Sequence, residues 1–76
     1  MNEKLKTVLD IINELRDEKD EDSLNEIIDS TSLREDAGLD SIDLAVLTAR
    51  LDEHFGIDIF ADGIVETIGE VMEKLG

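Results

Sequence analysis

Hydrophobic residues recur with a helical period in three stretches of the chain. In the first stretch, about Glu3 to Arg16, apolar residues lie three or four positions apart and so share one face of an amphipathic helix. This stripe consists of Leu5, Val8, Leu9, Ile12 and Leu15. The opposite face, which we expect to be solvated, carries Lys4, Asn13, Glu14 and Asp17. The pattern predicts a first helix that packs against a core through a single stripe.

The second stretch, about Ser41 to Phe55, carries two apolar stripes. One of them spans roughly 100° of the helix circumference and predicts the core face; it consists of Leu44, Leu47, Leu51 and Phe55. The far side carries Ile42, Ala45, Val46 and Ala49, with Asp52 and Glu53 at its border, and Asp43 is a third acid that we assign to this surface. Small exposed apolar residues beside acids are typical of a docking surface for a partner. The alternative is that this second stripe packs against the long loop.

The third stretch runs to the end of the chain. Thr67 and Glu70 have the spacing of a capping box, which predicts a helix start. The apolar stripe of this last helix consists of Ile64, Ile68, Val71, Met72 and Leu75. Gly56 is well placed to end the preceding helix, and residues 57–63 leave room only for a turn and one short helix. Gly69 should weaken the last helix by roughly 1 kcal/mol, unless a close approach requires a small residue there.

The connection between the first two helices is long and begins with a charged run, residues 17–23. This segment is rich in carboxylates, but it lacks the central glycine and the alternating ligand positions of a calcium-binding loop, so no metal site is predicted. Ser23 and Glu26 could form a capping box for a short helical turn inside the loop. We expect apolar loop residues to hold the loop to the bundle, namely Leu24, Ile27, Ile28, Leu33 and Leu39.

These elements predict an all-α fold, a small four-helix bundle of three main helices and one short helix with a long first loop. Proline is absent and the only aromatic residues are Phe55 and Phe60, so a β-rich fold has little support. The 76 residues suffice for one domain with one small core, which we assign to 1–76.

The charge balance restricts the partners that the chain can have. Seven basic residues against 21 acidic ones give a net charge of −14, which disfavours nucleic acid and anionic membranes and favours a basic protein surface. The absence of cysteine excludes disulfides and thiolate metal sites and fits a reducing compartment. No segment has the length and hydrophobicity of a membrane span or a signal peptide, so we expect a cytoplasmic protein, with a monomer as the default.

Ser41 is the strongest candidate for a functional residue. Asp40 can cap the free N–H groups of the second helix and Asp43 adds a negative charge to its first turn, so Ser41 opens the helix. A phosphate on its hydroxyl would meet free N–H groups and the positive end of the helix dipole. The only histidine, His54, lies thirteen residues further on, roughly 20 Å along the same helix, too far to act as a base for Ser41. These residues therefore predict a serine that is modified, and no catalytic residue.

At this point the chain resembles a known family. Gly38, the Asp40-Ser41 pair, Ile42 and Asp43, followed by the apolar series Leu47, Leu51 and Phe55, resemble the motif of acyl carrier proteins. The resemblance implies a 4'-phosphopantetheine group attached to Ser41. It also implies a protein that is not an enzyme and carries acyl thioesters in fatty acid or polyketide-type biosynthesis. The partners would be a phosphopantetheinyl transferase and acyl-processing enzymes with basic patches. The residues that could line a space for the acyl chain are Leu44, Leu47, Phe60 and Ile64.

Two other functions remain open. A stand-alone carrier of aminoacyl, D-alanyl or other specialised groups is possible, because Val46 and Ala37 depart from the usual residues of the family at these positions. Phe60, where a proline is common, is a third departure and concerns the conformation of residues 57–66. The alternative from a different class is an acidic helical adaptor that is never modified.

Overall fold

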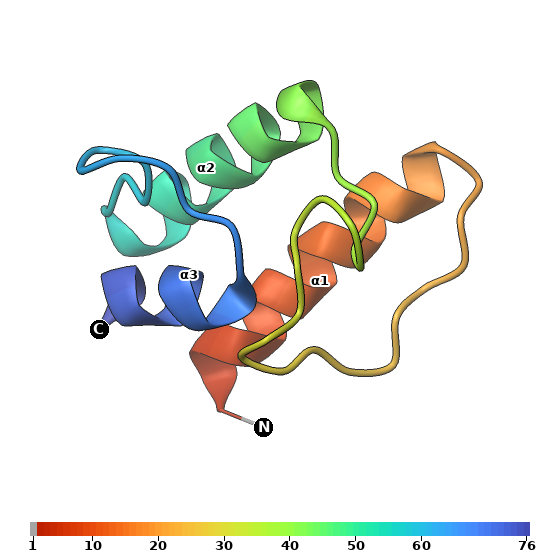
Figure 1. The fold of residues 1–76 in the computed structure, drawn as a ribbon, viewed down its shortest axis with the longest axis horizontal. Coiled ribbons are helices and arrows are strands. Elements are labelled where there is room, and N and C mark those ends of the chain that lie inside the picture. Colours follow the sequence, from red (N-terminus) through yellow and green to blue (C-terminus); the bar gives the residue numbers. More distant parts are fainter. Residues whose placement is uncertain (1) are drawn as a thin grey trace.

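A computed structural model describes residues 2–76 and is all-helical, as predicted. The helices are α1 (Glu3–Glu18), α2 (Ser41–Phe55) and α3 (Ile68–Leu75), and α1 packs against both of the others (Figure 1). Residues 2–76 contain no strand, and their one isolated β-bridge joins Ser32 to Thr67. The four-helix prediction is not confirmed, because the structure has three helices over this range.

The first helix follows its predicted stripe and extends slightly beyond it. Asn2 caps α1 by accepting a hydrogen bond from the backbone N–H of Leu5, and the helix ends at Glu18 rather than Arg16. The buried face is wider than predicted, since Ile11 is also in the core. Asn13 does not belong to a solvated face. Its side-chain amide donates to the carbonyl of Leu24 and accepts from the Leu24 N–H, so it holds the loop to α1.

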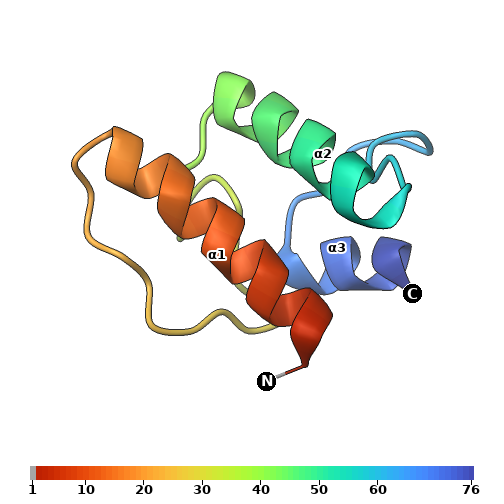
Figure 2. The same cartoon turned by 180° about the vertical axis from the view of Figure 1, so that it is seen from behind.

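One apolar core joins all three helices and the first loop. Each helix contributes its predicted stripe, and the loops contribute Ile27, Leu33, Leu39, Ile59 and Val65. The largest side chains that are completely buried are Ile12, Leu33, Leu47, Leu51, Ile59 and Ile68, with Val8 and Val71. The views in Figures 1 and 2 show residues 19–40 returning along α1 before they reach α2. The loop is therefore part of the hydrophobic core.

The short helical turn predicted after Ser23 is absent. Asn13 already binds both backbone groups of Leu24, and the N–H of Ile28 donates to the Thr31 hydroxyl, so these groups are not available for helical bonds. Leu33, Leu39 and Ile27 are buried as expected, whereas Ile28 is 58% exposed and does not hold the loop to the bundle.

The short helix expected in residues 57–63 is also absent, and turns take its place. Gly56 ends α2 in the left-handed conformation, as predicted. The Asp58 carboxylate then accepts from the Phe60 N–H, and the following backbone bonds span only three residues, which favours successive turns over a helix. Ile64 lies before α3 and is 81% exposed, so the predicted stripe of the last helix starts at Ile68 instead.

Gly69 is required by a close approach, the exception that the sequence analysis allowed. The approaching segment is the first loop. The Gly69 N–H donates to the Asp29 carbonyl, and a Cβ atom built at Gly69 would lie 3.0 Å from that oxygen. Thr67 caps α3 by accepting from the Glu70 N–H. The start of α3 is thereby joined to the loop that precedes α2.

Candidate functional site

The N-terminus of α2 is closed by a reciprocal pair of hydrogen bonds. The Asp43 N–H donates to Asp40 Oδ1 (2.8 Å), and the Asp40 N–H donates to Asp43 Oδ2 (3.1 Å). Asp40 is therefore the N-cap, as predicted, and Asp43 completes a capping box that the sequence analysis did not foresee. Ser41 occupies the first position of the helix, and its side chain is exposed.

Asp43 differs from the other acids predicted for the docking surface, because it is buried. Only 9% of the residue is exposed, and Lys19 Nζ donates to its Oδ2 at 2.7 Å. This hydrogen bond lowers the pKa of Asp43 and raises that of Lys19. Lys19 also donates to the carbonyl of Gly38. The carboxylate of Asp43 thus serves mainly to join α2 to α1.

Two basic residues at the end of α1 hold the backbone that leads to the serine. Arg16 Nη1 donates to the Ala37 carbonyl at 2.6 Å, and Lys19 Nζ donates to the Gly38 carbonyl at 2.7 Å. Gly38 has a φ of 71°, a conformation that favours glycine. Ala37 is completely buried, which restricts the size of the side chain at this position. Two side chains at the C-terminal end of α1 therefore hold the loop before Ser41.

The hydroxyl of Ser41 has one hydrogen-bonding neighbour within residues 2–76. Arg34 Nη2 donates to Ser41 Oγ at 3.3 Å. His54 lies in the last turn of α2, which agrees with the argument that it cannot act as a base for Ser41. The backbone N–H groups of Ser41 and Ile42 make no hydrogen bond to residues 2–76, as is usual for the first turn of a helix. The surroundings of the hydroxyl offer hydrogen-bond donors and a positive charge.

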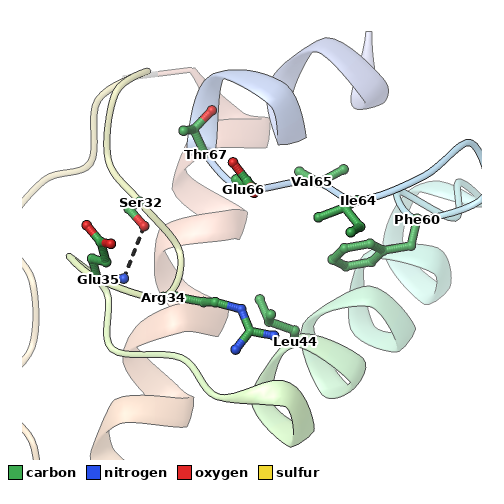
Figure 3. Close-up of a pocket in the computed structure, with 9 residues that line it drawn as sticks. All are labelled: Ser32, Arg34, Glu35, Leu44, Phe60, Ile64, Val65, Glu66 and Thr67. Atoms are coloured by element: carbon green, nitrogen blue, oxygen red, sulfur yellow. Dashed lines mark hydrogen bonds between the residues drawn. The ribbon is translucent and has the colours of Figure 1, made fainter.

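A pocket of about 550 Å³ lies beside Arg34. It is lined by Ser32, Arg34, Glu35, Leu44, Phe60, Ile64, Val65, Glu66 and Thr67. In Figure 3 the Arg34 side chain extends toward Leu44 of α2. Phe60 and Ile64, which belong to the segment that follows α2, lie on the other side of the pocket. Three of the four residues predicted to line an acyl space are present here; Leu47 is instead completely buried in the core.

The second stripe of α2 is exposed, as the docking interpretation requires. Ile42 is 75% exposed and Val46 37%, and Ala45 and Ala49 are exposed as well. Asp52 and Glu53 are exposed beside them. The alternative, that this stripe packs against the first loop, is wrong.

Comparison with known proteins decides the family. The family profile described as "Phosphopantetheine attachment site" matches residues 5–75. The chain belongs to the phosphopantetheine-binding carrier proteins. It is also similar to an acyl carrier protein of Saccharopolyspora erythraea, with 38% identity over 50 residues, 63% of this chain and 53% of that protein. The match thus spans about half the length of this relative. No solved structure matches significantly.

The residues around Ser41 fit the phosphopantetheine group. A phosphate ester needs an accessible hydroxyl and donors for its charged oxygens, and the site offers Ser41 Oγ, two free N–H groups and the Arg34 guanidinium. Within residues 2–76 there is no cluster of three or more His, Asp and Glu side chains suited to a metal ion. No helix in the described part of the chain is long and apolar enough to cross a membrane.

The sequence analysis missed Lys19 and Arg34. Both belong to the site only through tertiary contacts, across 24 residues to Asp43 and seven residues to Ser41. A basic residue in an irregular loop has no periodicity from which its direction could be read. The signal available for Lys19 was its place just after the last turn of a helix, as the C-cap, which is a common position for lysine and does not indicate a site.

Proposed function

We propose that this chain is a single carrier domain that holds acyl intermediates as thioesters on a 4'-phosphopantetheine arm attached to Ser41. The observation that carries the proposal is an exposed serine at the first position of a capped helix, with hydrogen-bond donors and no base around it. The arm supplies a terminal thiol, which the chain itself lacks because it has no cysteine. In the attachment step Ser41 Oγ would lose its proton and form a bond to the phosphorus that carries pantetheine. The phosphoanhydride bond of the activated donor would break, and the other phosphate of the donor would leave.

In this function the chain carries and does not catalyse. Its own residues expose the hydroxyl, hold the preceding loop and offer donors for the phosphate. A transferase must supply the base, since His54 is out of reach. The pathway is of the fatty acid or polyketide type, and an aminoacyl or D-alanyl carrier is the second candidate within the class. The completely buried Ala37, at a position where the family usually has a larger aliphatic residue, favours keeping this second candidate.

The partners are the phosphopantetheinyl transferase and acyl-processing enzymes with basic docking patches, in the cytoplasm. The docking surface that we propose consists of Ile42, Ala45, Val46, Ala49, Asp52 and Glu53, all exposed on α2. Its apolar residues are small, so the contact is weak and release is fast, while the acids steer a basic partner. Asp43 is excluded from this set because its carboxylate is already paired with Lys19.

The attachment site is tested by intact mass after co-expression with a transferase of broad specificity. The parent and Ser30→Ala should gain one phosphopantetheine, whereas Ser41→Ala should gain none. Ser30 is a suitable control because it is also exposed in the first loop. An adduct on Ser41→Ala would contradict the assignment, and an unmodified parent would favour the adaptor.

The docking surface is tested by initial rates of modification at low salt. Asp52→Lys should slow the reaction by about two- to five-fold, the range expected for an exposed charge pair, and Asp10→Lys on α1 should not. Both acids are exposed and both changes alter the net charge equally. Equal rates for the two variants would show that the charge of the docking surface does not guide the transferase.

A further inference from the structure

Arg34 is the arginine that has no carboxylate partner among residues 2–76. Arg16 pairs with Glu21 and Arg50 pairs with Glu14, whereas the guanidinium of Arg34 contacts the hydroxyl of Ser41. Four of the seven basic residues, Arg16, Lys19, Arg50 and Lys74, pair with an acid in the described part of the chain. Four of the five N–H donors of a guanidinium remain available when one of them binds a hydroxyl.

Modification of Ser41 would change what Arg34 contacts. The hydroxyl oxygen becomes an ester oxygen, a weak acceptor, and two charged phosphate oxygens come to lie one bond further out. A guanidinium binds such oxygens with two parallel hydrogen bonds, which are stronger than one bond to a neutral hydroxyl. The new negative charge would also adjoin Asp40, and Arg34 is the cation that hydrogen-bonds to this serine within residues 2–76.

We propose that Arg34 binds the phosphodiester on Ser41 and directs the attached arm into the pocket that Arg34 also lines. The proposal rests on the proposed function of Ser41. Arg34 both lines the pocket and donates a hydrogen bond to Ser41 Oγ, so its side chain connects the pocket to the point of attachment. Arg34 is therefore a positioning residue for the arm.

The lining of the pocket suits pantetheine. The arm contains amides, a hydroxyl and a pair of methyl groups, so it needs both apolar contacts and hydrogen bonds. Leu44, Phe60, Ile64 and Val65 supply an apolar side, and Ser32, Glu66 and Thr67 supply a polar side (Figure 3). The volume of about 550 Å³ is within the range of small-molecule sites.

A role for Arg34 in partner binding is less consistent with the charges. The partners of a chain with a net charge of −14 present basic surfaces, and a guanidinium at the attachment point would repel them. Arg34 also lies outside the docking surface of α2. Binding of the phosphodiester on Ser41 within the same chain would instead pair the positive charge of Arg34 with a negative one.

The experiment compares purified phosphopantetheine-loaded protein with its Arg34→Gln and Arg50→Gln variants. Arg50 is the control, because it is an arginine of intermediate exposure that carries the same charge and lies on α2 nine positions beyond Ser41. One measurement is the ³¹P chemical shift of the phosphodiester. The other is the rate at which iodoacetamide alkylates the thiol, which reports on the arm alone because the chain has no cysteine.

We expect Arg34→Gln to shift the ³¹P resonance and to raise the alkylation rate by about two- to five-fold, with Arg50→Gln unchanged. Added salt should reduce this difference, since the contact is exposed and screened. If Arg34→Gln proves poorly folded, the parent is tested alone: its ³¹P shift should move between low and high salt. Identical behaviour of both variants, or a ³¹P shift of the parent that is insensitive to salt, would overturn the proposal. Failure to load any protein would instead overturn the proposed function.

Discussion

The two ends of α2 are held in different ways. At its N-terminus a capping box and the Asp43–Lys19 pair join the helix to α1, and α1 also binds the carbonyls of the preceding loop. After its C-terminus, residues 57–65 form turns and irregular chain whose backbone bonds are local. They contact the core through Ile59 and Val65, which are buried, and through Ile57 and Phe60, which are partly buried. Polar contacts with α1 fix the end that carries the serine, whereas apolar contacts and one exposed ion pair, Asp62–Lys74, hold the segment after the other end.

This difference suits a carrier. We expect Ser41, the proposed attachment point, to keep one geometry toward different partners, because the loop before it is held by α1. The segment on the far side of the pocket makes few polar contacts beyond itself, namely the Glu66 carbonyl with the Leu33 N–H and Asp62 with Lys74. Segments with few such contacts open at lower cost. The pocket between them can therefore change in volume without moving Ser41. Substitutions at each end show whether the difference is as large as the contacts indicate.

The largest effect should come from Ile59→Ala. Ile59 is completely buried and holds the turns after α2 to the core, so its truncation should cost about 2–5 kcal/mol of unfolding free energy. Ile64→Ala in the same segment is the control. This side chain is 81% exposed, and its removal should change stability by about 0.5 kcal/mol or less. Urea denaturation measures both, and equal losses would contradict the assignment of Ile59 as the anchor.

Gly69→Ala should have the next largest effect. In an open helix this change stabilises by roughly 1 kcal/mol, but here the new Cβ would lie 3.0 Å from the Asp29 carbonyl oxygen. We expect a net loss of about 1–3 kcal/mol, because that oxygen is backbone and is bound by the Gly69 N–H. Glu73→Ala, on an exposed position of α3, controls for helix propensity. A stabilised Gly69→Ala variant would show that the loop can move away from α3.

Asp40→Ala should cost about 1 kcal/mol, the usual value for an N-cap, and lower the thermal midpoint by about 4–8 °C. Asp40→Asn preserves the acceptor for the Asp43 N–H and should remain close to the parent. Differential scanning calorimetry of the three proteins separates the two cases. If the asparagine variant lost as much as the alanine variant, the charge of Asp40 would be more important than its hydrogen bond.

The smallest effect should come from Lys19→Gln, and it should depend on pH. The folded pKa of Asp43 lies below its ordinary value of 3.8, so its share of the stability is present above that value and is lost as the pH falls. The folded pKa of Lys19 lies above its ordinary 10.5, so its share is present below that value and is lost as the pH rises. The parent should therefore melt above the variant at pH 7, by a margin that shrinks at pH 3. An equal margin at both pH values would remove the pair as the cause.

Local patterns along the sequence determined most of the secondary structure and the proposed position of the attachment site. The apolar spacing of α1 and α2, the cap at Asp40, the C-cap at Gly56 and the exposed second stripe all depend on residues within a few turns of one another. The motif of Asp40 followed by Ser41 can also be recognised from neighbouring residues alone. These features could be predicted because helix geometry fixes which nearby side chains share a face or reach a free N–H group.

Only the tertiary structure decided which residues surround the serine and what shape the loops take. Residues 24–28 are not helical because Asn13, eleven positions before Leu24, binds the backbone of that residue. Asp43 is buried and paired because Lys19, at the end of α1, donates a hydrogen bond to its carboxylate. Arg34 lies beside Ser41 because contacts with α1 and the core hold the loop between these two residues. Hydrogen bonds and ion pairs between distant segments depend on how those segments pack. The periodicity of residues along the chain does not predict that packing.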